Sequence, residues 1–284
     1  MVADDLSTGR LQNLNTGAIF YQTSVTSQGL EEIFEREQPA IVNHHAAQIS
    51  VIQSVKDPVK DAEVNIQGTV RLLDLSHRYG VEKLIFPSSG GTIYGEPQYM
   101  PCDEKHPIVP LSPYALSKRV AEEYLELYRR TYRLGYVTLR YGNVYGPRQD
   151  PHGEAGVIAI FSRLMLEGKQ PSVYGTGEQE RDFIYVDDVV DANILAMESG
   201  QGEYNIATGH GTSVNRIFEL LQGIIKYKWG PVHGPARPGE VFKIFLDSSK
   251  FEKEFGWKPK VSLEEGLSRT VEYFRKLDGS PATR

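Results

Sequence analysis

The sequence has 284 residues, 40% of them hydrophobic and 24% charged, which are ordinary values for a chain that buries one large α/β core. The formal net charge of −6 argues against a nucleic-acid binder, and no apolar run approaches the roughly 20 residues that span a bilayer. Cys102 is the only cysteine, which excludes an internal disulfide and argues against a structural zinc site. We expect a cytoplasmic protein without a bound metal.

Short apolar runs alternate with longer amphipathic stretches along the chain. Residues 40–43, 83–86 and 136–141 are predicted strands, and residues 61–79 are a predicted helix. A second helix is predicted from Ser112 and Pro113, a cap followed by proline in the first turn, to about Leu134. This alternation is typical of a parallel sheet covered by helices, and it predicts an α/β fold.

The composition changes after residues 142–156, where glycine and proline interrupt the pattern and the elements become shorter. We therefore predict a cofactor-binding domain over 1–146 and a mainly substrate-binding part over 147–284. The strand and helix predicted over 181–198 are expected to return to the first domain.

Tyr114 and Lys118 stand four residues apart on one face of the second predicted helix. A free phenol has a pKa of about 10, and a neighbouring ammonium favours the phenolate. Such a phenolate could remove a hydroxyl proton while hydride leaves the same carbon. The alternative is a surface lysine lying over a packed tyrosine.

Three hydroxyl residues follow the predicted strand at 83–86. Ser88, Ser89 and Thr92 lie just past its carboxyl end, where α/β sheets gather their ligands. A hydroxyl there could pass a proton between a substrate oxygen and Tyr114. Serine, tyrosine and lysine in this order favour the catalytic interpretation, although serine is also common in turns.

Several longer segments carry a resemblance to a known family. They include DDLSTG at 4–9, HHAAQISV at 44–51, VNIQGT at 64–69, SSGGTIYGEP at 88–97, SPYALSK at 112–118, LRYGNVYGPRQDPHGEAG at 139–156, RDFIYVDDV at 181–189 and RPGE at 237–240. In this order they resemble the UDP-glucose (galactose) 4-epimerase branch of the extended short-chain dehydrogenase/reductases. The resemblance implies a Rossmann-type, doubly wound parallel sheet with a smaller C-terminal substrate-binding part.

The resemblance implies NAD as the cofactor. Asp4, with Asp5 beside it, matches the acidic end of the family's second strand, which binds the adenosine ribose hydroxyls. An acid there favours NAD over NADP, because a 2′-phosphate would meet like charge. Tyr114 is the implied base, and Lys118 the residue that tunes it and holds the nicotinamide ribose. The other cofactor-binding residues that the resemblance implies are Ala46, Ala47, Asn65 and Tyr141.

The resemblance also implies a UDP-sugar substrate. Arg181 and Arg237 match the two arginines that grip the diphosphate, a task suited to a fixed, always charged fork. Ile244 stands where relatives screen the 2-substituent of the sugar, and a side chain smaller than tyrosine leaves room for N-acetylated sugars. The other implied substrate-binding residues are Ser89, Asn143, Tyr174 and Glu240.

Two features depart from the family's pattern. Gly90 stands where many relatives carry the acting serine, so we assign the proton relay to Ser89, with Thr92 as the alternative. The pattern also opens with a strand, a GxxGxxG turn and a helix, whereas this sequence opens within the second strand, roughly 30 residues later. The glycines at 90–91 and 175–177 do not replace that turn. A missing central strand is expected to expose the backbone edges of two neighbours.

We therefore expect NAD-dependent 4-epimerisation of a UDP-hexose by transient oxidation at C4. A dehydratase or decarboxylase is one alternative, but those relatives carry an acid in the loop that Gly90, Gly91 and Thr92 occupy here. A UDP-sugar-binding protein without cofactor is another, since the glycine loop is absent. The family also implies a homodimer through helices at 59–79 and 112–133, and neither a membrane nor a nucleic-acid partner.

Overall fold

The computed structural model describes residues 1–152, 156–236 and 241–277, and divides the chain into two compact units. The first unit comprises residues 1–89, 110–139 and 196–203, and the second comprises the remainder. Arg237 and Glu240, two of the predicted substrate-binding residues, lie outside the described residues.

The first unit carries the longer parallel strands. Its strands are β1 (Val2–Asp4), β2 (Phe20–Gln22), β3 (Ile41–Asn43), β4 (Lys83–Ser89), most of β5 (Gly135–Tyr141) and the start of β10 (Gly202–Ile206). Its helices are η1 (Leu11–Asn13), α1 (Leu30–Glu37), α2 (Val51–Lys56), α3 (Pro58–Ala62), η2 (Glu63–Gln67), α4 (Gly68–Arg78) and α6 (Pro113–Tyr132). The three strands and two helical regions predicted for this part are therefore confirmed, with small changes at their ends.

Strands β10, β5, β4 and β3 form one sheet in that order, and β1 and β2 form a second, parallel pair. Strand β3 has only β4 as a neighbour, and β1 has only β2, so both are edge strands in the part of the chain that is described. Val2 and Ile41 lie on these edges and are 37% and 39% exposed.

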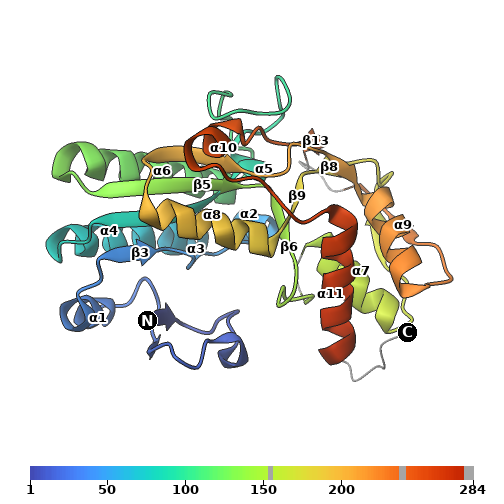
Figure 1. The fold of residues 1–284 in the computed structure, drawn as a ribbon, viewed down its shortest axis with the longest axis horizontal. Coiled ribbons are helices and arrows are strands. Elements are labelled where there is room, and N and C mark those ends of the chain that lie inside the picture. Colours follow the sequence, from blue (N-terminus) through green and yellow to red (C-terminus); the bar gives the residue numbers. More distant parts are fainter. Residues whose placement is uncertain (153–155, 237–240, 278–284) are drawn as a thin grey trace. The chain divides into compact units, whose positions relative to one another are not determined.

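The core of the first unit forms between the sheet and its helices. Helix α6 packs on β4 and beside α4 (Figure 1). Leu73, Leu84 and Ala121 are completely buried in this core, and Leu125 and Phe86 are 1% exposed. The run of apolar residues in β4 is explained by burial on both faces, as in parallel sheets generally.

The second unit consists of shorter elements. Its strands are β6 (Asn143–Tyr145), β7 (Ser172–Tyr174), β8 (Glu180–Arg181), β9 (Phe183–Tyr185), β11 (Thr212–Ser213), β12 (Val232–Gly234) and β13 (Lys243–Ile244). Its helices are α5 (Gly90–Ile93), α7 (Val157–Leu166), most of α8 (Val186–Glu198), α9 (Val214–Ile225), α10 (Ser249–Phe255) and α11 (Leu263–Leu277). The strands pair as β11-β8-β13, β12-β7 and β6-β9. Helix α11 packs on α7 and α9 (Figure 1).

This division differs from the predicted domains. Residues 90–109 and 140–146, predicted to lie in the first domain, belong to the second unit. Of the segment 181–198, which was expected to return to the first domain, only residues 196–198 do so. The reason is visible in Asp188, near the start of α8. Its carboxylate accepts hydrogen bonds from the backbone N–H groups of Lys260 and Val261, and its carbonyl accepts one from the Trp257 indole. These contacts tie α8 to the segment before α11.

Candidate active site

The predicted catalytic pair lies at the start of α6. The Ser112 hydroxyl accepts a hydrogen bond from the Ala115 N–H, and Pro113 occupies the first turn, so the sequence itself determines where the helix begins. This places Tyr114 in the first turn and Lys118 one turn later, on the buried face. Tyr114 is 9% exposed and Lys118 is 5% exposed. The alternative of a surface lysine is therefore wrong.

Lys118 is held against the end of β4. Its Nζ donates a hydrogen bond to the Pro87 carbonyl at 3.0 Å and lies 4.8 Å from the centre of the Phe86 ring. Burial lowers the pKa of Lys118 to about 8, although the negative charges of Asp61 and Glu122 raise it. The two carboxylates therefore help to keep Lys118 protonated near neutral pH, although burial favours the neutral amine.

Tyr114 meets Ser89, as the proton relay requires. A hydrogen bond between the two hydroxyls lowers the pKa of Tyr114, but burial outweighs it and the charge of Asp61 adds to the rise, giving a pKa of about 12. This differs from our expectation that Lys118 would bring the phenol's pKa below its usual value. Desolvation of the phenolate is the dominant effect in the protein without ligands.

Ser88 precedes Ser89 at the end of β4 and is 4% exposed. Its hydroxyl has no hydrogen-bond partner among the described residues. A buried hydroxyl without a partner is costly, so the carboxyl end of β4 retains an unused polar group next to Ser89. Thr92, the alternative relay, lies in α5 of the second unit.

Asn65 was expected to contact the nicotinamide side of the cofactor. Its amide oxygen accepts a hydrogen bond from the Gln48 N–H at 2.8 Å. Its amide nitrogen lies within hydrogen-bond distance of the Gln48 carbonyl, the Asp61 carboxylate and the Ser117 hydroxyl. The side chain therefore holds the loop after β3 to α6.

Sequence reasoning did not single out Asp61, Gln48 and Ser117. Asp61 precedes Asn65 by one helical turn, and this spacing could have identified it. The loop that contains Gln48 begins with His44, whose Nε2 lies 3.0 Å from the Thr69 hydroxyl. Burial, with the charge of Lys118 adding to it, lowers the pKa of His44 to about 3, so His44 is neutral.

The remaining predicted cofactor residues lie at strand ends. Asp4 ends β1, where its Oδ1 accepts a hydrogen bond from the Leu6 N–H at 2.6 Å. A Cβ on Gly9 would lie 2.6 Å from the same oxygen, so a larger residue at position 9 would require the Asp4 carboxylate to move. Asp5 is exposed, and hydrogen bonds from Ser7 lower its pKa.

Ala46 and Ala47 lie in the loop after β3, where Ala46 is exposed and Ala47 half-buried. Tyr141 ends β5 and belongs to the second unit, where its hydroxyl accepts a hydrogen bond from Asn193 Nδ2 at 2.6 Å. Burial raises the pKa of Tyr141, so it stays a neutral phenol.

Three of the predicted substrate residues are described in the second unit. Asn143 begins β6, and its backbone N–H donates to the Asp182 carbonyl at 2.6 Å. Tyr174 ends β7 and is 39% exposed. Arg181 lies half-buried on β8, and its Nη1 donates to the carbonyls of Glu180 at 2.8 Å and Phe242 at 3.3 Å.

Ile244 lies on β13 and is 1% exposed. It packs in a small core with Tyr94, Cys102 and Leu246. A larger side chain at this position would have to displace those neighbours.

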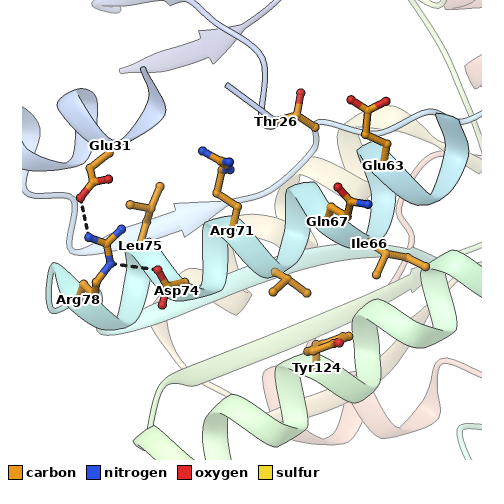
Figure 2. Close-up of a pocket in the computed structure, with 11 residues that line it drawn as sticks. Thr26, Glu31, Glu63, Ile66, Gln67, Arg71, Asp74, Leu75, Arg78 and Tyr124 are labelled. Carbon is orange, nitrogen blue, oxygen red and sulfur yellow. Dashed lines mark hydrogen bonds and ion pairs between the residues drawn. The ribbon is translucent and has the colours of Figure 1, made fainter. Parts of the chain in front are cut away.

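A surface groove of about 590 Å³ also occurs in the first unit, but none of the predicted site residues lines it. Figure 2 shows Arg78 between Glu31 and Asp74, with Ile66 and Tyr124 on the other side. Arg78 donates to Glu31 at 2.5 Å and to Asp74 at 3.0 Å, so its charge is matched. The groove therefore shares no lining residue with the cluster of Tyr114, Lys118 and Ser89.

Two features are absent from the residues that the structure describes. None of their helices combines the length and apolar character needed to cross a bilayer. They also contain no group of three or more His, Cys, Asp or Glu side chains arranged to hold a metal ion.

Comparison with known proteins relates this arrangement to a family. The family model described as GDP-mannose 4,6 dehydratase matches residues 2–270. A putative UDP-glucose 4-epimerase of Methanocaldococcus jannaschii is 45% identical, over 97% of this chain and 90% of that protein. The chain belongs to this sugar-nucleotide epimerase and dehydratase family.

Solved structures of family members agree with the fold. The UDP-glucose 4-epimerase of Thermotoga maritima, solved with UDP-glucose, is 52% identical with a TM-score of 0.95, over 97% of this chain and 90% of that one. The UDP-glucose 4-epimerase of Thermus thermophilus, solved with NAD, is 43% identical with a TM-score of 0.92, over 96% and 90%. The fold is therefore the expected Rossmann-type α/β fold, and the chain is a UDP-glucose 4-epimerase-like enzyme.

Within this family, the first unit fits a dinucleotide by the chemistry of its side chains. Asp4 offers carboxylate oxygens of the kind that accept hydrogen bonds from ribose hydroxyls, and Ala46 and Ala47 in the loop after β3 have small side chains. Lys118 has N–H donors beyond the one that Pro87 accepts. The buried, unpartnered Ser88 hydroxyl lies at the same strand end as Ser89.

The loop after β4 carries one of the two departures from the family's pattern. A Cβ on Gly90 would lie 2.4 Å from a Leu246 methyl and 3.2 Å from the Arg140 carbonyl. A serine in this position would need the local packing to move. The close packing around position 90 favours glycine there.

Proposed function

We propose that the protein is an NAD-dependent epimerase that inverts C4 of a UDP-hexose of the glucose and galactose type. The observation that carries the proposal is the buried cluster of Tyr114, Lys118 and Ser89 at the end of β4. The relatives named above as UDP-glucose 4-epimerases support the reaction and the substrate class.

In this reaction Tyr114 removes the proton of the sugar 4-hydroxyl, and Ser89 hands that proton between the substrate oxygen and the phenol. NAD, when bound, would supply the hydride acceptor and donor for C4, and Tyr114 would return the proton to the C4 oxygen when hydride comes back to the opposite face of the sugar. The phenol of the protein alone has a pKa of about 12, so it needs a further positive charge to act near neutral pH. Lys118 and the cationic nicotinamide would both favour the phenolate.

The cofactor-binding residues proposed for the first unit are Asp4 and Asp5 for the adenosine ribose, and Ala46 and Ala47 for the close approach of the cofactor. An acid at the end of β1 favours NAD over NADP, because a 2′-phosphate would be repelled. Lys118 would hold the nicotinamide ribose with the N–H donors that Pro87 leaves free. In the second unit Tyr141 is proposed as a further cofactor contact.

Substrate binding is assigned to residues of the second unit. Arg181 would bind the UDP diphosphate together with Arg237, because guanidinium groups form paired hydrogen bonds to phosphate oxygens. Asn143 is proposed to contact the diphosphate or sugar, Tyr174 to lie against the uridine, and Glu240 to take part in binding. Ile244 is smaller than tyrosine, so N-acetylated sugars are proposed as additional substrates.

A 4,6-dehydratase is the second candidate, because the matching family model carries that description. Elimination of water needs an acid near the sugar, and relatives with that activity carry one in the loop after β4. Here the loop consists of Gly90, Gly91, Thr92 and Ile93, which supply no ionisable group. This composition favours epimerisation.

We also propose a homodimer in which α4 and α6 contribute to the interface. Leu116, Val120, Tyr124 and Leu127 form one stripe along α6, and the first and last are 53% and 51% exposed. Tyr124 shares the groove of Figure 2 with Ile66. Replacing Leu116 and Leu127 together by glutamate should convert a dimer to a monomer in sedimentation velocity, whereas an unchanged sedimentation coefficient would refute this interface.

The proposed reaction is tested with UDP-galactose that carries deuterium at C4. Purified protein is incubated with this substrate and saturating NAD in ordinary water, and the product is analysed by NMR and mass spectrometry. We expect UDP-glucose with deuterium retained at C4, because the hydrogen leaves and returns as hydride. A 4-keto-6-deoxy product would support the dehydratase instead, and UDP binding without any conversion would support a cofactor-free binding protein.

A further inference from the structure

Asp61 is a buried carboxylate that the proposed chemistry does not yet use. It lies on α3, is 1% exposed, and accepts hydrogen bonds on Oδ1 from Gln48 Nε2 at 2.7 Å and from Asn65 Nδ2 at 3.0 Å. Both donors are neutral amides, and no Lys or Arg among the described residues forms an ion pair with it. A buried negative charge without an ion pair is expensive, so its presence calls for a compensating role.

Asp61 belongs to a connected network that reaches the catalytic helix. Asn65 Nδ2, which donates to Asp61, also lies 3.2 Å from the Ser117 hydroxyl. The Ser117 hydroxyl donates in turn to the Tyr114 carbonyl at 2.9 Å. Gln48 brings the loop after β3 into the same network through both its backbone and its side chain. Three segments are thus held to the first turn of α6, and the π-helical turn η2 that presents Asn65 is a feature often found at functional sites.

The charges around the catalytic pair can be assigned one by one. Lys118 is influenced by Asp61 from α3 and by Glu122 from α6, and its own charge lowers the pKa of His44 in the loop after β3. Glu122 is already paired with Arg119 at 3.1 Å. Asp61, which forms no ion pair with a described Lys or Arg, acts on Lys118 together with Glu122, and it also raises the pKa of Tyr114.

We propose that Asp61 is a positioning residue for the proposed reaction: it holds Gln48 and Asn65 against α6 and supplies the negative charge that balances the Lys118 ammonium. The inference rests on the proposed function for its catalytic meaning. The effect of the Asp61 charge on Lys118 does not depend on a substrate, so it can be measured without turnover. Asp61 itself touches neither Tyr114 nor Lys118 through a hydrogen bond.

The test is Asp61→Asn, which keeps the size of the side chain and an oxygen acceptor for both amides but removes the charge. Lysine is labelled with 13C at Cε, and the Lys118 signal is assigned by its absence in Lys118→Met. We expect the titration midpoint of Lys118 to fall by roughly one pH unit, since a nearby opposite charge shifts a pKa by that order. Asp57→Asn is the matched control, because Asp57 is an exposed cap of the same helix and should leave the midpoint in place.

The pH dependence of epimerisation provides the catalytic readout. Loss of the Asp61 charge favours the neutral amine of Lys118 and the phenolate of Tyr114, so both limbs of the profile of kcat/KM should move to lower pH. A purely structural role would lower the rate without moving the limbs. Asp61→Glu keeps the charge and should keep the limbs in place.

The outcomes separate this inference from the proposed function. An unchanged Lys118 midpoint in folded Asp61→Asn would overturn the inference, even in an active enzyme. The inference would also be overturned if the limbs of the kcat/KM profile moved as far in Asp61→Glu as in Asp61→Asn. If the wild type does not epimerise UDP-galactose but its Lys118 midpoint moves as expected in Asp61→Asn, the proposed function fails while the assigned charge balance stands.

Discussion

Replacing Lys118 by methionine measures how much its buried ammonium costs the fold. Methionine has a similar length and is apolar, so it can occupy the same space beside Phe86 and Pro87. We expect Lys118→Met to be more stable than the wild type at neutral pH and to lose catalysis. Functional residues often reduce stability in this way.

The magnitude follows from the pKa of Lys118. Lowering it from 10.5 to about 8 corresponds to about 3 kcal/mol of destabilisation at pH 7, a value that already includes the attraction of Asp61 and Glu122. The Pro87 carbonyl loses its donor in the variant, which costs about 1 kcal/mol. The variant should therefore gain about 2 kcal/mol in free energy of unfolding at pH 7.

The sign of the pH dependence is fixed by the direction of the shift. The pKa is lower in the folded state, so the full cost is present below about pH 8 and declines as the pH rises toward 10.5. At pH 9.5 the cost should have fallen to about 1.5 kcal/mol. The stability advantage of Lys118→Met over the wild type should therefore shrink between pH 7 and pH 9.5.

Urea unfolding at these two pH values measures the difference. Lys56→Met is the control, because Lys56 is exposed on α2 and its charge remains in water. It should show no comparable change between the two pH values. A Lys118→Met protein that is less stable than the wild type at pH 7, or whose advantage does not change with pH, would refute the reasoning.

Two further predictions concern the relay and the second unit. Ser89→Ala removes the hydrogen bond that lowers the pKa of Tyr114, so kcat should fall by about 10²-fold. The acid limb of the pH profile should also move to higher pH, and an unmoved limb would argue against the relay. Asp188→Ala removes the acceptor of two backbone N–H groups, and the free energy of unfolding should fall by about 3 kcal/mol in urea titrations. The exposed neighbour Asp187→Ala is its control, and equal losses in both variants would contradict this account.

The sequence predicted the parts of the fold that local chemistry determines. Ser112 and Pro113 begin α6 because a hydroxyl cap and a proline are both favoured there, and this places Tyr114 and Lys118 correctly. The apolar run of β4 was equally clear, because a strand buried on both faces has few alternatives. The hydrogen bond between Ser89 and Tyr114 follows from these two elements.

Features that depend on contacts between distant segments were not predictable in the same way. The helix predicted over 61–79 contains a π-helical turn at 63–67, and its polar residue Asn65 faces Gln48 and Ser117. The direction of the pKa shift of Tyr114 depends on how deeply the ring is buried, which the spacing of residues in the sequence does not reveal. The division into units depends on contacts such as those of Asp188 with the segment near Lys260.

The central claim is that Tyr114 takes the proton of the sugar 4-hydroxyl. The most direct measurement compares Tyr114→Phe with the wild type in the conversion of UDP-galactose to UDP-glucose at saturating NAD. The account predicts that kcat falls at least about 10²-fold, while UDP binding measured by calorimetry is unchanged. A variant that converts UDP-galactose as fast as the wild type would contradict it.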